Sequence, residues 1–209
     1  MRTSSDFQLR IVTSGPGSLV EVRPMVAGAD VIAQADNDFP GADPISVLLA
    51  LQAGDEPHEV RLAEAECTEL CCGALHVTIR RDADQVVWGP WRNTSDTGTE
   101  FEEVRFDAVA YDAELRRVTE DHSWEWPART VARLLEAELR QHGDHFAAWD
   151  CELNGVNCLD GVVVVFTYRA NQRFRIDFVL TDRPPAEQVV GLAGLVLAGD
   201  PRKLGKAIG

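Results

Sequence analysis

Lysine is scarce in this chain of 209 residues: only Lys203 and Lys206 are present, against eighteen arginines. An arginine excess of this kind is typical of proteins from GC-rich genomes and carries little functional information. Acids outnumber bases, with 34 Asp and Glu against 20 Lys and Arg, so the formal net charge is −14. Because an acidic surface repels phosphate backbones, this composition argues against nucleic-acid binding. It is compatible with a basic protein partner, or with solubility alone.

Long apolar runs are missing as well. The start of the chain, 1–17, contains no continuous apolar segment of the kind found in secretory signals. The longest apolar stretch, 189–199, is too short to cross a bilayer. We therefore expect a cytoplasmic protein without a membrane partner. Thiols in that compartment are normally reduced, so the five cysteines do not indicate a disulfide framework.

Signatures of catalysis are not found in the sequence. It has no phosphate-binding loop, no nucleophile elbow and no His-Glu-x-x-His motif. The segment 15–19, Gly-Pro-Gly-Ser-Leu, lacks the length and the lysine of a phosphate loop. The sequence leaves enzymatic activity open, and it predicts no catalytic and no cofactor-binding residue.

Acidic residues crowd the segment 96–121. Paired carboxylates can perform acid–base chemistry, but these are spread over an expected loop and helix surface. We therefore predict a solvated acidic face rather than an active site. The residues are Asp96, Glu100, Glu102, Glu103, Asp107, Asp112, Glu114, Glu120 and Asp121.

The hydrophobic pattern predicts an α+β fold, with 45% hydrophobic and 26% charged residues as in ordinary globular proteins. The region 1–105 is expected to be β-rich with one short helix, and 106–209 to hold antiparallel strands packed by helices. The two regions can also form one continuous domain, 1–209. Strands are predicted by alternation or by turn residues at 7–13, 19–26, 30–35, 58–65, 74–91 (a hairpin turning at 82–84), 161–169 and 173–180. Helices are predicted by apolar spacing and capping residues at 43–54, 106–118, 123–143 and 184–199.

The last of these helices, 184–199, has almost no polar side chains. Val189, Val190, Leu192, Leu195 and Val196 cover nearly its whole circumference. We therefore expect it to be buried against the sheet formed by 162–168 and 173–180, or covered by a second subunit, so that a homo-oligomer is a further expectation.

The dipeptide Asn154-Gly155 is a strong signal for a two-residue hairpin turn. That turn would place Cys151 opposite Cys158 on neighbouring strands. Cysteine behaves as a small hydrophobic residue in such places, so we expect packing rather than a disulfide.

Cys67, Cys71 and Cys72 form a second thiol group, between two predicted strands. Tetrahedral zinc requires four ligands, and adjacent cysteines rarely point at one ion. A fourth ligand would have to come from His76, Cys151 or Cys158. The alternative is a thiol-rich structural turn. We expect no cofactor, and less than one zinc per chain.

The stretch 67–92, Cys-Thr-Glu-Leu-Cys-Cys-Gly through Val-Val-Trp-Gly-Pro-Trp-Arg, resembles one common in a group of uncharacterised actinobacterial proteins. Those proteins have a Cys-x-Cys-Gly-x-x-Gly-Cys-Gly loop before a hairpin that ends in Val-x-Trp. The segments Asp-Pro-Ile-Ser-Val-Leu-Leu and Phe-Asp, at 43–49 and 106–107, are similar too. Ala65 stands where the first family cysteine is expected, so the motif is degraded. The resemblance implies no activity.

The closely spaced histidines and tryptophans remain to be interpreted. His142 and His145 are spaced as metal ligands on one helix face would be, but Gly143 predicts a helix end and therefore two solvated histidines. Trp124 and Trp126 are two positions apart and Trp88 and Trp91 three, so we do not expect all of them to face one core, and at least one of the five tryptophans is expected at a surface or interface.

Two hypotheses about function follow. The first is a non-enzymatic, acidic protein-interaction module that meets a basic protein. The second is a small-molecule or metal-binding enzyme with a site between the two halves, for which the weak metal candidates are Cys67, Cys71, Cys72 and His76. A flat or tryptophan-bearing acidic surface favours the first, and a cleft of converging carboxylates or histidines favours the second.

Overall fold

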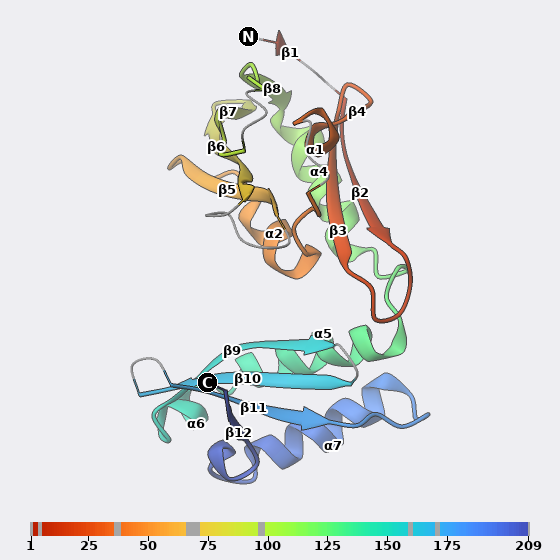
Figure 1. Ribbon diagram of the computed structural model, residues 1–209, viewed down its shortest axis with the longest axis vertical. Coiled ribbons are helices and arrows are strands. Elements are labelled where there is room, and N and C mark those ends of the chain that lie inside the picture. The colour runs from red at the N-terminus through yellow and green to blue at the C-terminus, as the bar shows by residue number, and fades with distance from the viewer. Residues whose placement is uncertain are drawn as a thin grey trace. The chain divides into compact units, whose positions relative to one another are not determined.

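The computed structural model describes residues 2–3, 6–35, 39–65, 72–95, 99–158, 161–169 and 172–208 (Figure 1). The chain forms two compact units, Met1–Trp124 and Glu125–Gly209, and each has its own hydrophobic core. Helices and antiparallel sheets occur in both, which confirms the predicted α+β class. The boundary between the units lies after Trp124, further along the chain than the division at 105/106 predicted from sequence. The reason is that the strand and helix between 104 and 120 pack in the first core.

Among the residues that the structure describes, the first unit has two sheets and the helices α1, α2 and α4. In the five-stranded sheet the order is β1-β8-β7-β6-β5, and in the three-stranded sheet it is β2-β3-β4. All pairings are antiparallel except that of β1 with β8. The strands are β1 (Arg2–Thr3), β2 (Phe7–Thr13), β3 (Val20–Val26), β4 (Ala29–Asp30), β5 (His58–Glu64), β6 (Ala74–Asp82), β7 (Gln85–Asn93) and β8 (Val104–Asp107). The helices are α1 (Val31–Gln34), α2 (Pro44–Ala50) and α4 (Ala108–Glu120).

Capping side chains decide where these helices begin. The Asp43 carboxylate accepts a hydrogen bond from Ile45 N, as the sequence predicted for α2. Asp107 does the same for Ala110 N, so α4 begins after β8 instead of at Phe106. Asp30 accepts from two backbone N–H groups of α1, so the strand predicted over 30–35 was wrong: only Ala29–Asp30 pairs with β3.

Aromatic rings fill the first core. The ring of Phe7 stacks on Tyr111 with centroids 4.5 Å apart and meets the edge of Trp88 at 5.3 Å. The Trp88 indole N–H donates to the Tyr111 hydroxyl (3.2 Å), which donates to the carbonyl of Leu51 (2.7 Å). Burial raises the pKa of Tyr111. The polar atoms of both aromatic residues are therefore satisfied inside an apolar core.

The second unit is a four-stranded antiparallel sheet, in the order β12-β11-β10-β9, with helices on one face (Figure 1). Its strands are β9 (Cys151–Cys158), β10 (Val162–Tyr168), β11 (Gln172–Phe178) and β12 (Lys206–Ile208). Its helices are α5 (Pro127–Arg140), α6 (Gly143–Ala147), α7 (Pro185–Leu197) and the 3₁₀ helix η2 (Pro201–Lys203). In the described part of the chain, no helix is both long enough and apolar enough to span a bilayer.

The hairpin predicted at Asn154-Gly155 was wrong. Both residues lie inside the single strand β9, and neither has the positive φ that the turn requires. A register shift opposite Val165 and Phe166 accommodates the extra residue. Cys151 and Cys158 therefore lie at opposite ends of one strand. Both side chains are buried in the second core and neither is in a disulfide, so the interpretation as packing residues is confirmed although their cross-strand pairing is wrong.

Helix α7 is only partly buried within its own unit, which corrects the prediction that packing against the sheet buries it; cover by a second subunit stays a prediction. Val189, Ala193 and Val196 enter the core, beside α5 and the sheet. On the opposite side Val190 is 75% exposed and Leu195 55% exposed. This helix thus has more apolar side chains than its own unit buries.

Each unit protects an edge strand with a glutamate–arginine pair from a helix. In the first unit, Glu114 of α4 accepts from Leu9 N (2.7 Å) and Arg117 donates to Leu9 O (3.1 Å). In the second, Glu136 of α5 accepts from Val156 N (3.0 Å) and pairs with Arg140. Outward-facing backbone groups of β2 and β9 are thereby occupied, which disfavours pairing with another chain.

Candidate functional site

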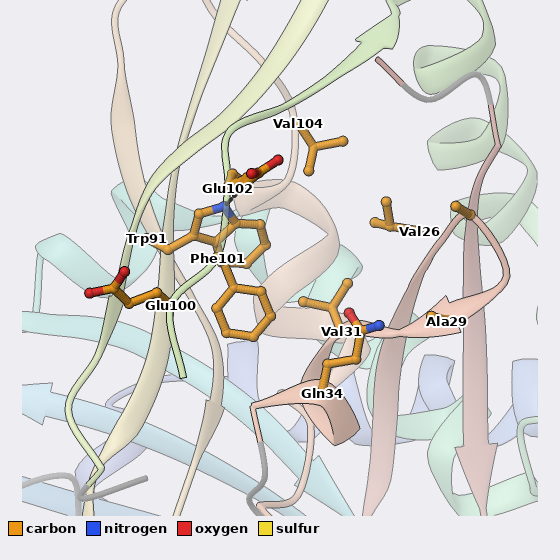
Figure 2. A pocket seen from close by; sticks show the side chains of 10 residues that line it. Val26, Ala29, Val31, Gln34, Trp91, Glu100, Phe101, Glu102 and Val104 are labelled. Atoms are coloured by element: carbon orange, nitrogen blue, oxygen red, sulfur yellow. Dashed lines mark hydrogen bonds between the residues drawn. The ribbon is translucent and has the colours of Figure 1, made fainter. Parts of the chain in front are cut away.

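A pocket of about 310 Å³ opens in the first unit (Figure 2). It is lined by the turn from β3 into β4, by helix α1, by Trp91 of β7 and by the segment that leads into β8. The lining residues are Val26, Ala27, Ala29, Val31, Gln34, Trp91, Glu100, Phe101, Glu102 and Val104. Segments far apart in sequence therefore build this site.

Two stacked aromatic rings form one wall of the pocket. Trp91 and Phe101 lie with their ring centroids 4.9 Å apart and an interplanar angle of 28°. The Trp91 indole N–H donates to the carbonyl of Glu102 (3.0 Å), which fixes the ring against this segment (Figure 2). A half-buried tryptophan with its polar atom satisfied offers a flat, rigid binding surface.

A bulge in β7 places Trp91 there. Trp88 is opposite Ile79 and Trp91 is opposite Val77, so two residues of β7 face one of β6 at this point. Gly89, with φ of +140°, lies within this bulge. Trp88 is consequently buried and Trp91 lies against it at 5.8 Å, half-exposed. The expectation that one tryptophan reaches the surface is confirmed, but both face the core side of the sheet.

The charges around the pocket have one sign. Glu100 and Glu102 belong to the lining, and Figure 2 shows Gln34 beside Val31, on the wall opposite the aromatic rings. No Lys, Arg or His is among the ten residues that line it. The chain stretches that supply most of the lining, 24–57 and 93–104, contain six and four acids and no Lys or Arg. The ionisable side chains of the lining, Glu100 and Glu102, are therefore both acidic.

Nearly all of the net negative charge of the chain belongs to the first unit. Residues 1–124 contain 10 Arg against 23 Asp and Glu, a net charge of −13. Residues 125–209 contain 10 Lys and Arg against 11 Asp and Glu, a net charge of −1. The first unit is the part that attracts cations.

Most of the other carboxylates between 96 and 121 have structural partners. Glu103 pairs with Arg80 and Arg105, and its pKa is lowered chiefly by the hydrogen bond from Arg80. Asp112 accepts two hydrogen bonds from Arg81. Neither carboxylate is among the residues that line the pocket.

Two further hollows of the first unit are less suited to a ligand. One, of about 440 Å³, is lined by Arg81 and Asp112, which neutralise each other, and by Arg116. The other, of about 320 Å³, lies between Leu19 and Ala65 and is lined mainly by small residues. Neither is lined by an aromatic ring.

The weak metal candidates are not brought together among the described residues. Cys67 and Cys71 lie outside those residues, and Cys72 is exposed immediately before β6. The His76 ring is buried on β6 with Nδ1 3.4 Å from the Glu59 carboxylate. Within the described ranges there is no group of three or more His, Cys, Asp or Glu that could hold a metal ion. The zinc expectation therefore stays a prediction.

His142 and His145 do not form a pair. Helix α5 ends at Arg140, so His142 lies outside it as the N-cap residue of α6, whereas His145 lies within α6. His142 lies 3.3 Å from the Glu138 carboxylate, and His145 lies 3.3 Å from the carbonyl of Gly199. Their separate partners explain both residues without a shared ion.

Comparison with protein families, with curated proteins and with solved structures finds no match for this chain. The resemblance of 67–92 to a family loop accordingly stays an expectation. The sequence patterns did not identify Phe101, Gln34 or Val31 as site residues. A signal was present, because Trp91 is followed by a stretch, 93–104, in which all charges are negative.

Proposed function

We propose that this protein is a non-enzymatic, cytoplasmic interaction module, and that the pocket beside Trp91 takes an arginine or lysine side chain of a basic protein partner. The observation that carries the proposal is the stacked pair of Trp91 and Phe101 in a pocket whose lining charges are all negative. A cation beside an aromatic face gains about 0.5–2 kcal/mol, depending on how far it is desolvated.

The size and the charge of the site support this ligand class. A volume of about 310 Å³ is at the small end of ligand pockets, and suits a single side chain better than a cofactor. The net charge of −13 on the first unit would steer a basic protein toward it and would repel nucleic acid and anionic lipid.

The enzyme hypothesis gains no support from this pocket. Among its lining residues, Glu100 and Glu102 are the ionisable ones, and His, Cys, Ser and Lys are not among them. General acid–base or nucleophilic catalysis needs such groups in hydrogen-bonding reach of each other. We therefore advance one function.

Calorimetric titration with a short arginine-rich peptide, and with the same peptide carrying Glu for Arg, tests the proposal. We expect the basic peptide to bind and the acidic one not to bind. Trp91→Leu keeps the charge of the protein but removes the aromatic wall, so it should weaken binding by at least about tenfold. Trp91→Phe should retain most of the affinity.

Trp124→Leu is the matched control, because Trp124 is also half-buried in the first unit but does not line the pocket. It should leave the affinity unchanged. Equal binding by wild type and Trp91→Leu would show that only the overall charge attracts the peptide, and the pocket would then have no role.

A further inference from the structure

We infer that the exposed side of α7 is a homodimer interface, in which the helices of two copies pack antiparallel across a two-fold axis. The outer stripe comprises Glu187, Val190, Gly191, Gly194 and Leu195 of α7 and its C-cap residue Ala198, which recur at helical spacing and are all exposed. This inference concerns the second unit and is independent of the pocket.

Apart from Glu187, the outer stripe is apolar, although its own unit does not bury it. Its large residues, Val190 and Leu195, are 75% and 55% exposed. From Gln188 to Gly199 the chain contains no charged residue. A solvent-facing helix side normally carries charge, so a surface of this kind indicates a contact with another molecule.

Gly191 and Gly194 point to close approach by that molecule. Glycine inside a helix is unfavourable, and neither residue has the positive φ that would require it. A Cβ added to either would meet nothing within 4 Å, so packing within the described chain does not require glycine either. Two adjacent small positions on an exposed face allow a second backbone to come near.

Charge complementarity identifies the occupant as a second copy. The second unit has a net charge of −1, so two copies can approach there without the repulsion that the first unit, at −13, would impose. Glu187 lies at the start of α7, and Lys203 is exposed just after its end. Antiparallel pairing of two identical helices would bring Glu187 of each copy toward Lys203 of the other.

The helix spans about 20 Å, and one helix face per copy buries less than the roughly 1,200–2,000 Å² of a stable interface. We therefore expect a dimer with a dissociation constant in the micromolar range. Sedimentation equilibrium of the full chain, from about 1 to 100 µM, measures it directly. If the wild type stays monomeric throughout this range, the inference is wrong. It is also wrong if the wild type stays monomeric because a different protein binds the stripe.

Three substitutions locate the interface. Leu195→Asp should weaken dimerisation more than tenfold, because it places a charge on the apolar contact. Gly194→Leu should weaken it as well by blocking close approach, although it replaces a residue unfavourable to the helix and so does not threaten folding. Val179→Asp is the control, since Val179 is 91% exposed in the same unit but lies outside the outer stripe. A dimer that survives the first two variants, or is lost equally in the third, contradicts the assignment.

A charge exchange tests the antiparallel geometry. Glu187→Lys alone and Lys203→Glu alone should each weaken the dimer several-fold, and the double variant should restore it. Additive losses in the double variant would refute the two-fold pairing. Circular dichroism of every variant checks that the fold is kept.

Discussion

The two units of this protein pack their cores in the same way, but their surfaces differ in net charge and in exposed apolar residues. Each buries an aliphatic and aromatic core between a sheet and helices, and each protects an edge strand with a glutamate from a helix. The first unit has a net charge of −13 and the second of −1. The first unit therefore carries nearly all of the net negative charge, and the second exposes an apolar face of α7. A composition averaged over the whole chain conceals this division.

Neighbouring residues on α7 give the sharpest test of the surface assigned to the second unit. Val196 is fully buried, so Val196→Asp places an unpaired charge in the core and should lower the free energy of unfolding by roughly 3–5 kcal/mol. Leu195→Asp should leave the monomer almost unchanged, because Leu195 faces solvent. Urea denaturation of both variants at a concentration where the wild type is monomeric measures the difference. Equal losses would mean that the outer stripe is buried.

Tyr111→Phe tests the first core in the same way. It leaves the Trp88 indole N–H and the Leu51 carbonyl without the hydroxyl that both contact. Buried polar groups that lose a partner cost about 1–3 kcal/mol each, so we expect a loss of about 2–4 kcal/mol. The signal from tryptophan fluorescence should report this loss, because Trp88 is in contact with the hydroxyl. An unchanged midpoint of denaturation would mean that these hydrogen bonds contribute nothing.

Part of this architecture could be predicted from sequence because it depends on local signals. The turn at 82–84, the capping by Asp43 and the position of Pro127 in the first turn of α5 each depend on one or two residues. The strand β9 could not be predicted this way. Asn154-Gly155 favours a turn locally, but a continuous ladder with β10 and the contact from Glu136 stabilise the extended strand.

The pocket could not be predicted from the sequence either, for a different reason. Its aromatic wall pairs Trp91, which follows a bulge in β7, with Phe101 from the segment before β8, and its opposite wall comes from α1. No periodic pattern links segments so far apart. Composition likewise could not decide which side of α7 is covered, because apolar residues occur all around it and only the packed structure separates Val196 from Leu195.

The edge-strand contacts predict a smaller effect, and one that depends on pH in the first unit. Glu114→Ala and Glu136→Ala each remove the acceptor of an edge-strand N–H, and each should cost about 1–2 kcal/mol. Hydrogen bonds from Arg117 and from Leu9 N lower the pKa of Glu114, although burial opposes this. Its contribution is therefore present above the ordinary glutamate pKa of about 4.3 and is lost as pH falls through the lower folded value.

Denaturation curves between neutral pH and pH 3 measure that dependence. The wild type should lose stability over this range by more than Glu114→Ala does, because the variant has no such carboxylate to protonate. Glu114→Gln is the control, since its amide oxygen can still accept from Leu9 N but does not titrate. Parallel pH profiles for wild type and Glu114→Gln would show that this carboxylate does not contribute.

The smallest expected effect concerns the thiols, which also differ between the units. Cys72 is exposed in the first unit, whereas Cys151 and Cys158 are buried in the second. Burial raises the pKa of Cys151, and the thiolate is the reactive species, so Cys151 should be alkylated slowly at neutral pH. Iodoacetamide labelling of the native protein, followed by peptide mass mapping, should show Cys72 modified many-fold faster than either. Elemental analysis of the same sample should find less than one zinc per chain, and a chelator should then leave the rate at Cys72 unchanged. One zinc per chain together with acceleration by the chelator would instead establish Cys72 as a metal ligand, because a coordinated thiolate is protected until the ion is removed.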